Sequence, residues 1–219
     1  MKPFSKVGKH VLRDRVARFA TNEFTLDLGC GNSPLARWFP NRIGCDIGPY
    51  SGVDVVCDAH ALPYRDGSFS VVLCMEVLEH LHHPQTAVAE ISRVLKDGGQ
   101  LILTCPFVYP VHEAPHDYQR YTEYGLRVLF GEHFDSIEIS PLFSEEQTLA
   151  ILIQRIVFQR DDSPLMKWFL NKIAFWLFNM KPRHTRRFQH ISRTVEGEFL
   201  TAGYLLTAKK STTPAAGGK

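Results

Sequence analysis

The sequence predicts an α/β domain built on a doubly wound, mostly parallel sheet of seven strands. Short apolar stretches that suit strands alternate with segments of helical periodicity, which is typical of a parallel sheet covered by helices. The first strand, Phe24–Leu28, runs directly into Gly29 and Gly31, and Ser33 and Pro34 then suit a helix start. This order of strand, glycine turn and helix is the unit with which doubly wound folds hold a small polar ligand.

The remaining elements follow from the same two periodicities. We expect further strands at 43–47, 53–57, 69–75, 100–105, 134–139 and 203–209, and helices at 9–20, 33–39, 84–95, 122–130, 145–160 and 164–180. The last two helices form an insertion before the seventh strand. We therefore expect one domain over 1–210 with a helical insertion at about 145–195, and a disordered tail at 211–219.

Composition gives little indication of a macromolecular partner. The net charge of +2 does not favour a nucleic acid. The chain contains no apolar run of about 18 residues that would span a membrane, and its first residues lack the apolar core of a signal peptide. These features predict a cytoplasmic protein.

The cysteines at 30, 45, 57, 74 and 105 lie at or near the ends of predicted strands, in apolar surroundings. None of them forms a Cys-x-x-Cys pair, and their spacing does not suit zinc. We expect reduced, buried thiols.

Acidic residues mark the ends of three successive predicted strands: Asp27, Asp46 and Asp58. Carboxylates in these places suit a cationic ligand that carries a ribose better than a polyphosphate. A dinucleotide-binding turn would carry a third glycine where Leu35 or Ala36 stands. A nicotinamide-dependent oxidoreductase is therefore an alternative that fits less well.

The chain resembles the class I S-adenosylmethionine-dependent methyltransferases, and most closely their type 11 branch. The matching pieces are LDLGCGNSP (26–34), GCDI (44–47), CDAHALPYRDGSFSVVLCMEVLEHL (57–81) and EISRVLKDGGQLILTCPF (90–107). One departure is Ser33, which stands where many members have a third glycine. The resemblance implies a Rossmann-like methyltransferase fold, an enzyme, and S-adenosyl-L-methionine as the cofactor.

The resemblance also implies how the cofactor is held. Gly29 and Gly31 would face the methionine moiety, and Asp46 would bind the ribose hydroxyls. Asp58 and Ala59 would flank the adenine, and the backbone near 74–76 would lie by the sulfonium. The full set of expected cofactor contacts is Asp27, Gly29, Cys30, Gly31, Asp46, Ile47, Asp58, Ala59, Met75 and Glu76.

A long loop after the fifth strand, 106–122, is rich in Pro, aromatic and titratable residues, and such loops are usually functional. One hypothesis makes His116 a general base oriented by Asp117. The alternative is that Asp117 and Arg120 form a structural pair that pins the loop. We expect acceptor contacts from His80, His112, Tyr118, Arg120 and Tyr121, with a packed core histidine as the alternative for His80. We expect no metal; the alternative ligand set is His112, His116 and Asp117.

The second helix of the insertion is strongly aromatic, with Trp168, Phe169 and Trp176 among its residues, and a basic run at 181–187 follows it. It would either pack against the sheet or a partner subunit, as in a homodimer, or lie on a membrane surface beside the site. We expect methyl transfer, most simply to oxygen, on a small-molecule or lipid-linked acceptor, with peripheral membrane contact through 165–187. The alternatives are a catalytically silent protein that binds S-adenosylmethionine or S-adenosylhomocysteine, and an NAD-dependent oxidoreductase.

Overall fold

The computed structural model describes residues 8–180 and 200–212. Its centre is one seven-stranded sheet in the order β3-β2-β1-β4-β5-β7-β6. The strands are β1 (Thr25–Leu28), β2 (Arg42–Asp46), β3 (Val55–Val56), β4 (Phe69–Met75), β5 (Leu95–Pro106), β6 (Phe134–Pro141) and β7 (Gly203–Lys210). β1 to β5 pair in parallel, and β7 lies antiparallel between β5 and β6. The predicted doubly wound, mostly parallel sheet is confirmed.

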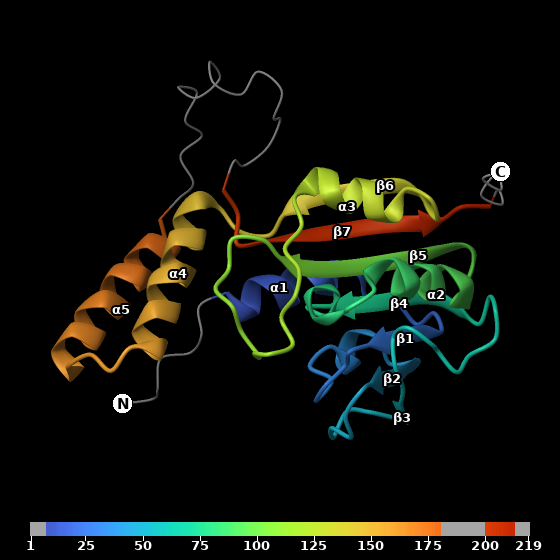
Figure 1. The fold of residues 1–219 in the computed structure, drawn as a ribbon, viewed down its shortest axis with the longest axis horizontal. Coiled ribbons are helices and arrows are strands. Elements are labelled where there is room, and N and C mark those ends of the chain that lie inside the picture. The colour runs from blue at the N-terminus through green and yellow to red at the C-terminus, as the bar shows by residue number, and fades with distance from the viewer. Residues whose placement is uncertain (1–7, 181–199, 213–219) are drawn as a thin grey trace, which may run out of the picture.

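Helices cover both faces of the sheet (Figure 1). They are α1 (Lys9–Val16), α2 (Pro84–Val94), α3 (Glu123–Phe130), α4 (Glu145–Gln159) and α5 (Pro164–Phe178), with short 3-10 turns at Ala17–Phe19, Ala36–Trp38 and Leu78–His80. Alternate residues of the strands point to opposite faces: Leu101 and Leu103 pack with Ile91 of α2, whereas Ile102 packs with Val16 of α1. These apolar layers bury the sheet and fix the positions of its strand ends.

The helices after β5 begin at polar caps. The Thr122 hydroxyl accepts a hydrogen bond of 3.1 Å from the Gly125 amide at the start of α3. Ser144 and Gln147 cap α4 reciprocally, since the serine hydroxyl accepts from the Gln147 amide and the Gln147 side chain accepts from the Ser144 amide. Such caps satisfy amides that a first helical turn leaves unpaired.

The predicted helix at 33–39 is wrong: only the 3-10 turn Ala36–Trp38 forms there. Ser33 has φ of 49°, a left-handed conformation and not the extended one typical of a capping serine. Its amide donates 2.7 Å to the Cys30 carbonyl, while the Gly52 amide donates 3.1 Å to the Gly31 carbonyl. The chain after the glycines is thus held as a tight turn, and no helix N-terminus faces the glycines.

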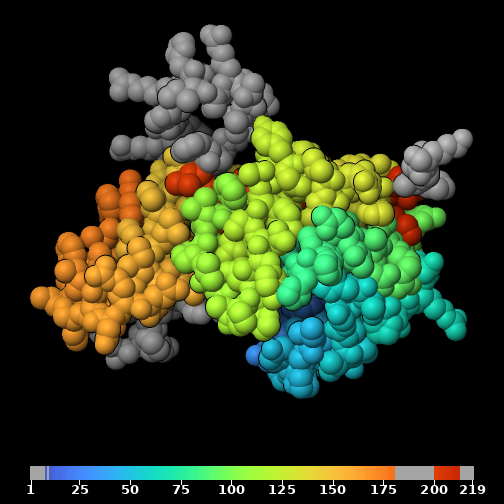
Figure 2. Space-filling model, in the orientation of Figure 1, coloured from blue at the N-terminus to red at the C-terminus, as the bar shows by residue number. Residues whose placement is uncertain are grey.

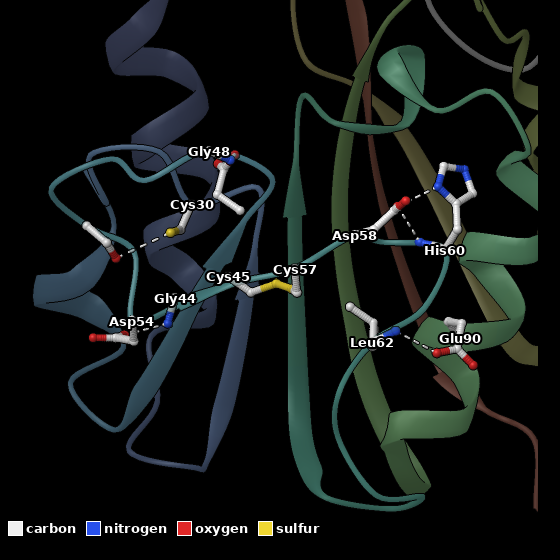
Figure 3. Close-up of a disulfide and its surroundings, with 12 residues drawn as sticks. Cys30, Gly44, Cys45, Gly48, Asp54, Cys57, Asp58, His60, Leu62 and Glu90 are labelled. Carbon is white, nitrogen blue, oxygen red and sulfur yellow. Dashed lines mark hydrogen bonds and ion pairs between the residues drawn. A yellow bond between two sulfur atoms is a disulfide. The ribbon is translucent and has the colours of Figure 1, made fainter.

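The expectation of five reduced thiols is also wrong, because Cys45 and Cys57 form a disulfide (Figure 3). The parallel register of β2 and β3 sets Cys45 opposite Val55, and the Cys57 amide donates 2.9 Å to the Asp46 carbonyl. The pairing of these two strands therefore brings the cysteines together, which their spacing in the sequence does not indicate. Cys30, Cys74 and Cys105 are free and buried.

The α4–α5 hairpin projects from the carboxyl end of the sheet (Figure 1). Ala150, Ile151, Ala174 and Phe178 form a small buried cluster between its helices. Within the described ranges, no helix combines the length and the apolarity needed to cross a bilayer. The predicted basic run at 181–187, the insertion beyond residue 180 up to 195, and the tail from 213 on lie outside the described residues.

Candidate functional site

The two glycines after β1 have different environments. Both have left-handed backbones, with φ of 69° at Gly29 and 50° at Gly31. A Cβ atom at Gly29 would lie 2.1 Å from Val77 Cγ2, whereas a Cβ atom at Gly31 would meet no heavy atom within 4 Å. Gly29 is therefore required by the packing of the protein itself. Gly31 is the glycine that borders open space, where a ligand can approach the main chain.

Asp46, at the end of β2, ties that strand to the glycine turn. Its Oδ2 accepts a hydrogen bond of 2.9 Å from the Gly31 amide, and its Oδ1 accepts one of 3.3 Å from the Gly48 amide. The next side chain, Ile47, is 76% exposed and provides an apolar surface beside the carboxylate. The arrangement leaves lone pairs of Asp46 for a further donor, and its contact with a ribose stays a prediction.

Asp27 is buried in β1 and does not face open space. Its Oδ2 accepts 3.3 Å from the Ser33 hydroxyl and lies 3.9 Å from Arg42 Nη1. Burial raises the pKa of Asp27 to about 6, against the opposing effect of Arg42. Cys30 donates its thiol to the Gly52 carbonyl at 3.3 Å, and burial raises its pKa to about 11. The positive charge that lies beside the Asp27 carboxylate in the structure is therefore Arg42 of the protein itself.

Asp58 and Ala59 follow β3 at the same edge of the sheet. One Asp58 oxygen accepts a hydrogen bond of 2.9 Å from the His60 amide and lies 2.6 Å from His60 Nδ1 (Figure 3). The amide of His60 is the main cause that lowers the pKa of Asp58. Ala59 is buried. The contact of these two residues with an adenine stays a prediction.

A cavity of about 520 Å³ opens beside the carboxyl ends of β4 and β5. Residues from α1, β4, the loop 106–122, α4 and the start of β7 line it. They include Leu12, Arg13, Pro34, Met75, Glu76, Pro106, Tyr109, His112, Glu113, Leu142, Phe143, Ile151, Gln154, Arg155, Phe158, Ala202 and Gly203. Figure 2 shows the loop 106–122 filling the surface between the α4–α5 hairpin and the rest of the domain. The cavity therefore lies where the insertion meets the strand ends.

Glu76 is the carboxylate nearest the end of β4 in this lining. It has φ of 56°, and its amide donates 3.0 Å to the Thr104 carbonyl of β5. Burial, and then the neighbouring charge of Glu79, raise its pKa to about 7. Glu76 is one of the cofactor contacts expected from the sequence, and in the structure it also lies in the wall of the cavity.

An arginine and a tyrosine that sequence analysis missed meet inside the cavity. The Arg155 guanidinium donates to the Tyr109 hydroxyl and lies 4.7 Å from the centre of its ring. Arg13 of α1 also belongs to the lining. These residues come from α1, the loop and α4, so no local motif could identify them. The one signal in the sequence was an arginine within the apolar periodicity of 145–160.

Asp117 is bound to Arg120 through two hydrogen bonds of 2.5 and 2.7 Å. Its Oδ2 also accepts 2.8 Å from the His112 amide, and the Arg120 guanidinium holds the pKa of Asp117 well below its usual range. The geometry matches the structural pair that pins the loop. Asp117 therefore contacts His112 and Arg120. The catalytic roles of His116 and Asp117 stay predictions.

The other expected acceptor residues divide between two places. His80 and His112 lie close together, with ring centres 5.0 Å apart. His116 is exposed and meets the Tyr118 hydroxyl at 3.0 Å outside the cavity lining. Tyr121 packs against the main core, where burial raises its pKa to about 12. Only His112 of this group lines the cavity, and the roles of the others stay predictions.

Comparisons with known proteins give sequence matches over part of the chain. Residues 26–103 match the model of a methyltransferase domain family. The ubiquinone biosynthesis O-methyltransferase of Cronobacter sakazakii is 29% identical over 97 residues, which cover 44% of this chain and 38% of that protein. An uncharacterized protein of Methanocaldococcus jannaschii is 33% identical over 86 residues, covering 36% of this chain and 42% of its own length. The matches thus span about two fifths of each relative.

Solved structures show the same fold over most of the chain. A possible histamine N-methyltransferase from Thermotoga maritima superposes with a TM-score of 0.59 at 16% identity, covering 92% of this chain and 89% of its own. Phosphoethanolamine N-methyltransferase 2 of Haemonchus contortus, in complex with S-adenosylhomocysteine, gives 0.59 at 17% identity, covering 95% and 54%. The cyclase SpnF gives 0.57 at 18%, covering 92% and 81%. Likeness of fold therefore does not by itself assign a reaction.

Proposed function

The chain carries a methyltransferase domain of the class I S-adenosylmethionine-dependent family, type 11 branch, and we propose that it methylates an oxygen of an apolar acceptor that bears a negative charge. S-adenosyl-L-methionine is the cofactor of this family. It would lie over the glycine turn, with Gly31 against its methionine moiety and Asp46 on its ribose. The residues present fit this group, because Gly31 borders open space and Asp46 retains acceptor capacity.

The cavity beside β4 and β5 carries the proposal. Met75 and Glu76 belong both to the expected donor site and to the lining of the cavity, so an acceptor inside it would meet the donor at this point. Holding two reactants in line can supply much of the barrier reduction for a simple transfer. Glu76, half-buried in the wall, is placed to accept the proton that an acceptor hydroxyl loses.

The lining supports an acceptor with a large apolar part and an acidic group. Leu12, Phe143 and Ile151 offer apolar contacts, and each apolar group of that size contributes roughly 1.5–3 kcal/mol when fully buried. Arg155 supplies a charge-assisted donor inside the same space. The name of the Cronobacter relative gives oxygen as the methylated atom, which supports the same choice here.

The exposed face of α5 supports a lipid-linked acceptor that is reached from a membrane surface. Leu165, Phe169, Phe175 and Trp176 are each more than half exposed, next to a cavity whose lining includes Phe158 of the same hairpin. An exposed apolar helix face of this kind can contact the interface of a bilayer. We propose a peripheral location for the protein on this basis. A homodimer through α5 is the alternative use of the same face.

The proposal is tested in two stages. Calorimetry with S-adenosylmethionine, S-adenosylhomocysteine and NAD should show binding of the first two ligands alone. Transfer of a labelled methyl group is then measured with phenols that carry or lack a carboxylate and an apolar tail. The expected best acceptor carries the phenol hydroxyl, the carboxylate and the apolar tail together. Donor binding without transfer to any member of the panel, or to a whole metabolite extract, would instead favour a catalytically silent binding protein.

A separate measurement addresses the membrane surface. Co-sedimentation with vesicles of neutral and anionic lipid should decrease when Phe175 and Trp176 are changed to Ser. Tyr124→Ser on α3 is the matched control, since Tyr124 is also exposed but lies away from the hairpin. Equal co-sedimentation of all three proteins would contradict a peripheral location through α5. A concentration-dependent change in mass that Phe175→Ser abolishes would indicate the dimer.

A further inference from the structure

Glu79 is buried with its side chain only 1% exposed, yet neither carboxylate oxygen has a hydrogen-bond partner within the described part of the chain. A carboxylate withdrawn from water normally finds a donor or a cation, because an unpaired buried charge is costly. Two imidazole nitrogens lie close to Oε1, His112 Nε2 at 3.6 Å and His80 Nε2 at 3.7 Å. We propose that these three residues bind one divalent transition-metal ion.

The separations match those of a metal site. In a tetrahedral site with bonds of about 2.1 Å, neighbouring ligand atoms lie about 3.4 Å apart. The two distances from Glu79 Oε1 differ by only a few tenths of an ångström from that ligand-to-ligand separation. All three ligand atoms lie within 4.8 Å of one another. A small inward rotation of the side chains would bring the three atoms into one coordination sphere.

The other ring nitrogens both lie beside an oxygen, with a hydrogen bond at His80 Nδ1 and a close contact without one at His112 Nδ1. His80 Nδ1 is hydrogen-bonded to the backbone carbonyl of His116, and a carbonyl can only accept. The proton of His80 therefore sits on Nδ1, which leaves a lone pair on Nε2 facing Glu79. His112 Nδ1 lies 3.2 Å from Asp117 Oδ2, an oxygen that Arg120 also holds. A carboxylate or carbonyl behind each metal-binding ring is the usual outer arrangement.

The donor set decides the class of ion. Two imidazoles and one carboxylate suit Zn²⁺ and the neighbouring first-row metals, whereas Mg²⁺ and Ca²⁺ prefer oxygen ligands. Three protein ligands leave at least one coordination position open in such sites. His112 lines the cavity, and Glu113 Oε2 lies 3.8 Å from His80 Nε2 at its rim. If the proposed function holds, the open position would attract an anionic acceptor oxygen.

The test measures the metal and not the methyl transfer. The full chain, purified without a polyhistidine tag and treated with a chelator, is titrated with Co²⁺ and with Zn²⁺. We expect one equivalent of Co²⁺ to give a visible d–d absorption band that Zn²⁺ displaces. Glu79→Gln should weaken Zn²⁺ binding by more than about 100-fold, beyond the 10–100-fold typical of outer partners. His83→Ala is the matched control, because that exposed histidine lies outside the cluster.

Two results would overturn the site. One is the absence of a cobalt band in the unaltered protein, which needs no variant and does not depend on whether Glu79→Gln folds. The other is a result that does not depend on Glu79 or that depends on His83: equal Zn²⁺ affinity in folded Glu79→Gln and in the unaltered protein, or loss of the band in the control His83→Ala. Binding of S-adenosylhomocysteine by the metal-free protein is measured alongside. If the metal fails to bind while this ligand binds, the site is lost and the proposed function stands.

Discussion

The proposed donor side of the sheet differs from the proposed acceptor cavity in how its residues are brought together. Around the glycine turn, every expected contact lies within a few residues of the end of β1, β2, β3 or β4. The wall of the cavity instead combines α1, the loop 106–122, α4 and the start of β7. Its key pair, Tyr109 and Arg155, is separated by 46 residues in the chain.

This difference accounts for where the sequence match ends. The family model covers residues 26–103, which hold β1 to β4 and most of β5, and it stops before the loop that closes the cavity. Contacts made at strand ends are fixed once the sheet forms. Contacts made by an inserted hairpin can change without disturbing that sheet. We therefore expect variants on the two sides to separate donor affinity from acceptor turnover.

The largest expected effect is that of Glu76→Gln, which belongs to both sides. Removing the proposed proton acceptor at the end of β4 should lower kcat by about 10²–10⁴-fold, because general-base catalysis contributes that much. The affinity for S-adenosylhomocysteine, measured by calorimetry, should change by less than about threefold. Glu132→Gln, an exposed carboxylate after α3, is the control that should leave both values unchanged.

His116→Ala provides a second variant for the same measurement of kcat. This exposed histidine lies outside the cavity lining, so its loss should affect kcat far less than the loss of Glu76. A larger decrease in His116→Ala than in Glu76→Gln would contradict the assignment of the base and restore the hypothesis drawn from the sequence.

The next effect concerns stability and belongs to the donor side alone. The native pKa of Asp27 is raised from 3.8 to about 6, so the native state binds more protons than the unfolded state between these values. Stability contributed by this group is therefore lost as pH rises through that window, by about 3 kcal/mol when complete. Asp27→Asn should become more stable relative to the unaltered protein by about that amount between pH 4 and pH 7.

Chemical denaturation at several pH values checks this prediction. Asp66→Asn serves as the control, because the Asp66 side chain is 81% exposed at the surface. A difference between the two unfolding free energies that stays constant with pH would show that Asp27 ionises normally in the folded protein.

Periodicity predicted the sheet well and the turns around it poorly. The strand 69–75 agrees with β4 at both ends, and the helix expected at 122–130 forms as α3 behind its cap Thr122. These signals are local. The helix expected from Ser33 and Pro34 does not form, because hydrogen bonds from Gly52 and to Cys30 hold the segment as a turn. The Cys45–Cys57 disulfide likewise depends on which strands become neighbours, which local patterns do not specify.

The candidate site follows the same division. Asp46 and the glycines could be singled out because each lies in a short segment that matches the family, and Gly31 and Asp46 do meet at the ends of β1 and β2. Their contact with the cofactor stays a prediction. Arg155 could not be identified from the sequence, because its contact with Tyr109 depends on how α4 packs against the loop. The pairing of Asp117 was assigned to the adjacent His116, whereas the fold of the loop places His112 and Arg120 against it.

A smaller effect is expected from Asp46→Ala. Loss of the carboxylate would leave the ribose hydroxyls without their charged acceptor and free the Gly31 amide. Donor affinity should fall by about ten- to a hundredfold, corresponding to roughly 1.5–3 kcal/mol. Calorimetry with S-adenosylhomocysteine measures it. Asp97→Ala, at the other end of the sheet beside Lys210, should bind normally. Unchanged affinity in Asp46→Ala would remove the ribose assignment.

The smallest expected effect is that of Arg155→Met, and it isolates the acceptor side. Methionine keeps the apolar length of the side chain but removes the charge that faces the cavity. The KM for an acidic acceptor should rise roughly tenfold, since one hydrogen bond to a charged group contributes about 1.5 kcal/mol and Arg155 is half-buried. The donor affinity and the kcat at saturating acceptor should be unchanged, because the guanidinium does not belong to the donor side.

Two further variants make this last measurement specific. Arg160→Met removes a charge from the end of the same helix, where Arg160 is 66% exposed and paired with Asp162 at 3.2 Å, and it should leave KM unchanged. Arg155→Lys should recover part of the affinity, because an ammonium retains the charge but not the planar donor geometry. An acceptor without an acidic group should not distinguish Arg155→Met from the unaltered protein. If the KM for such a neutral acceptor also rises in Arg155→Met, Arg155 acts by holding Tyr109 and the loop in place, and the acceptor need not be anionic.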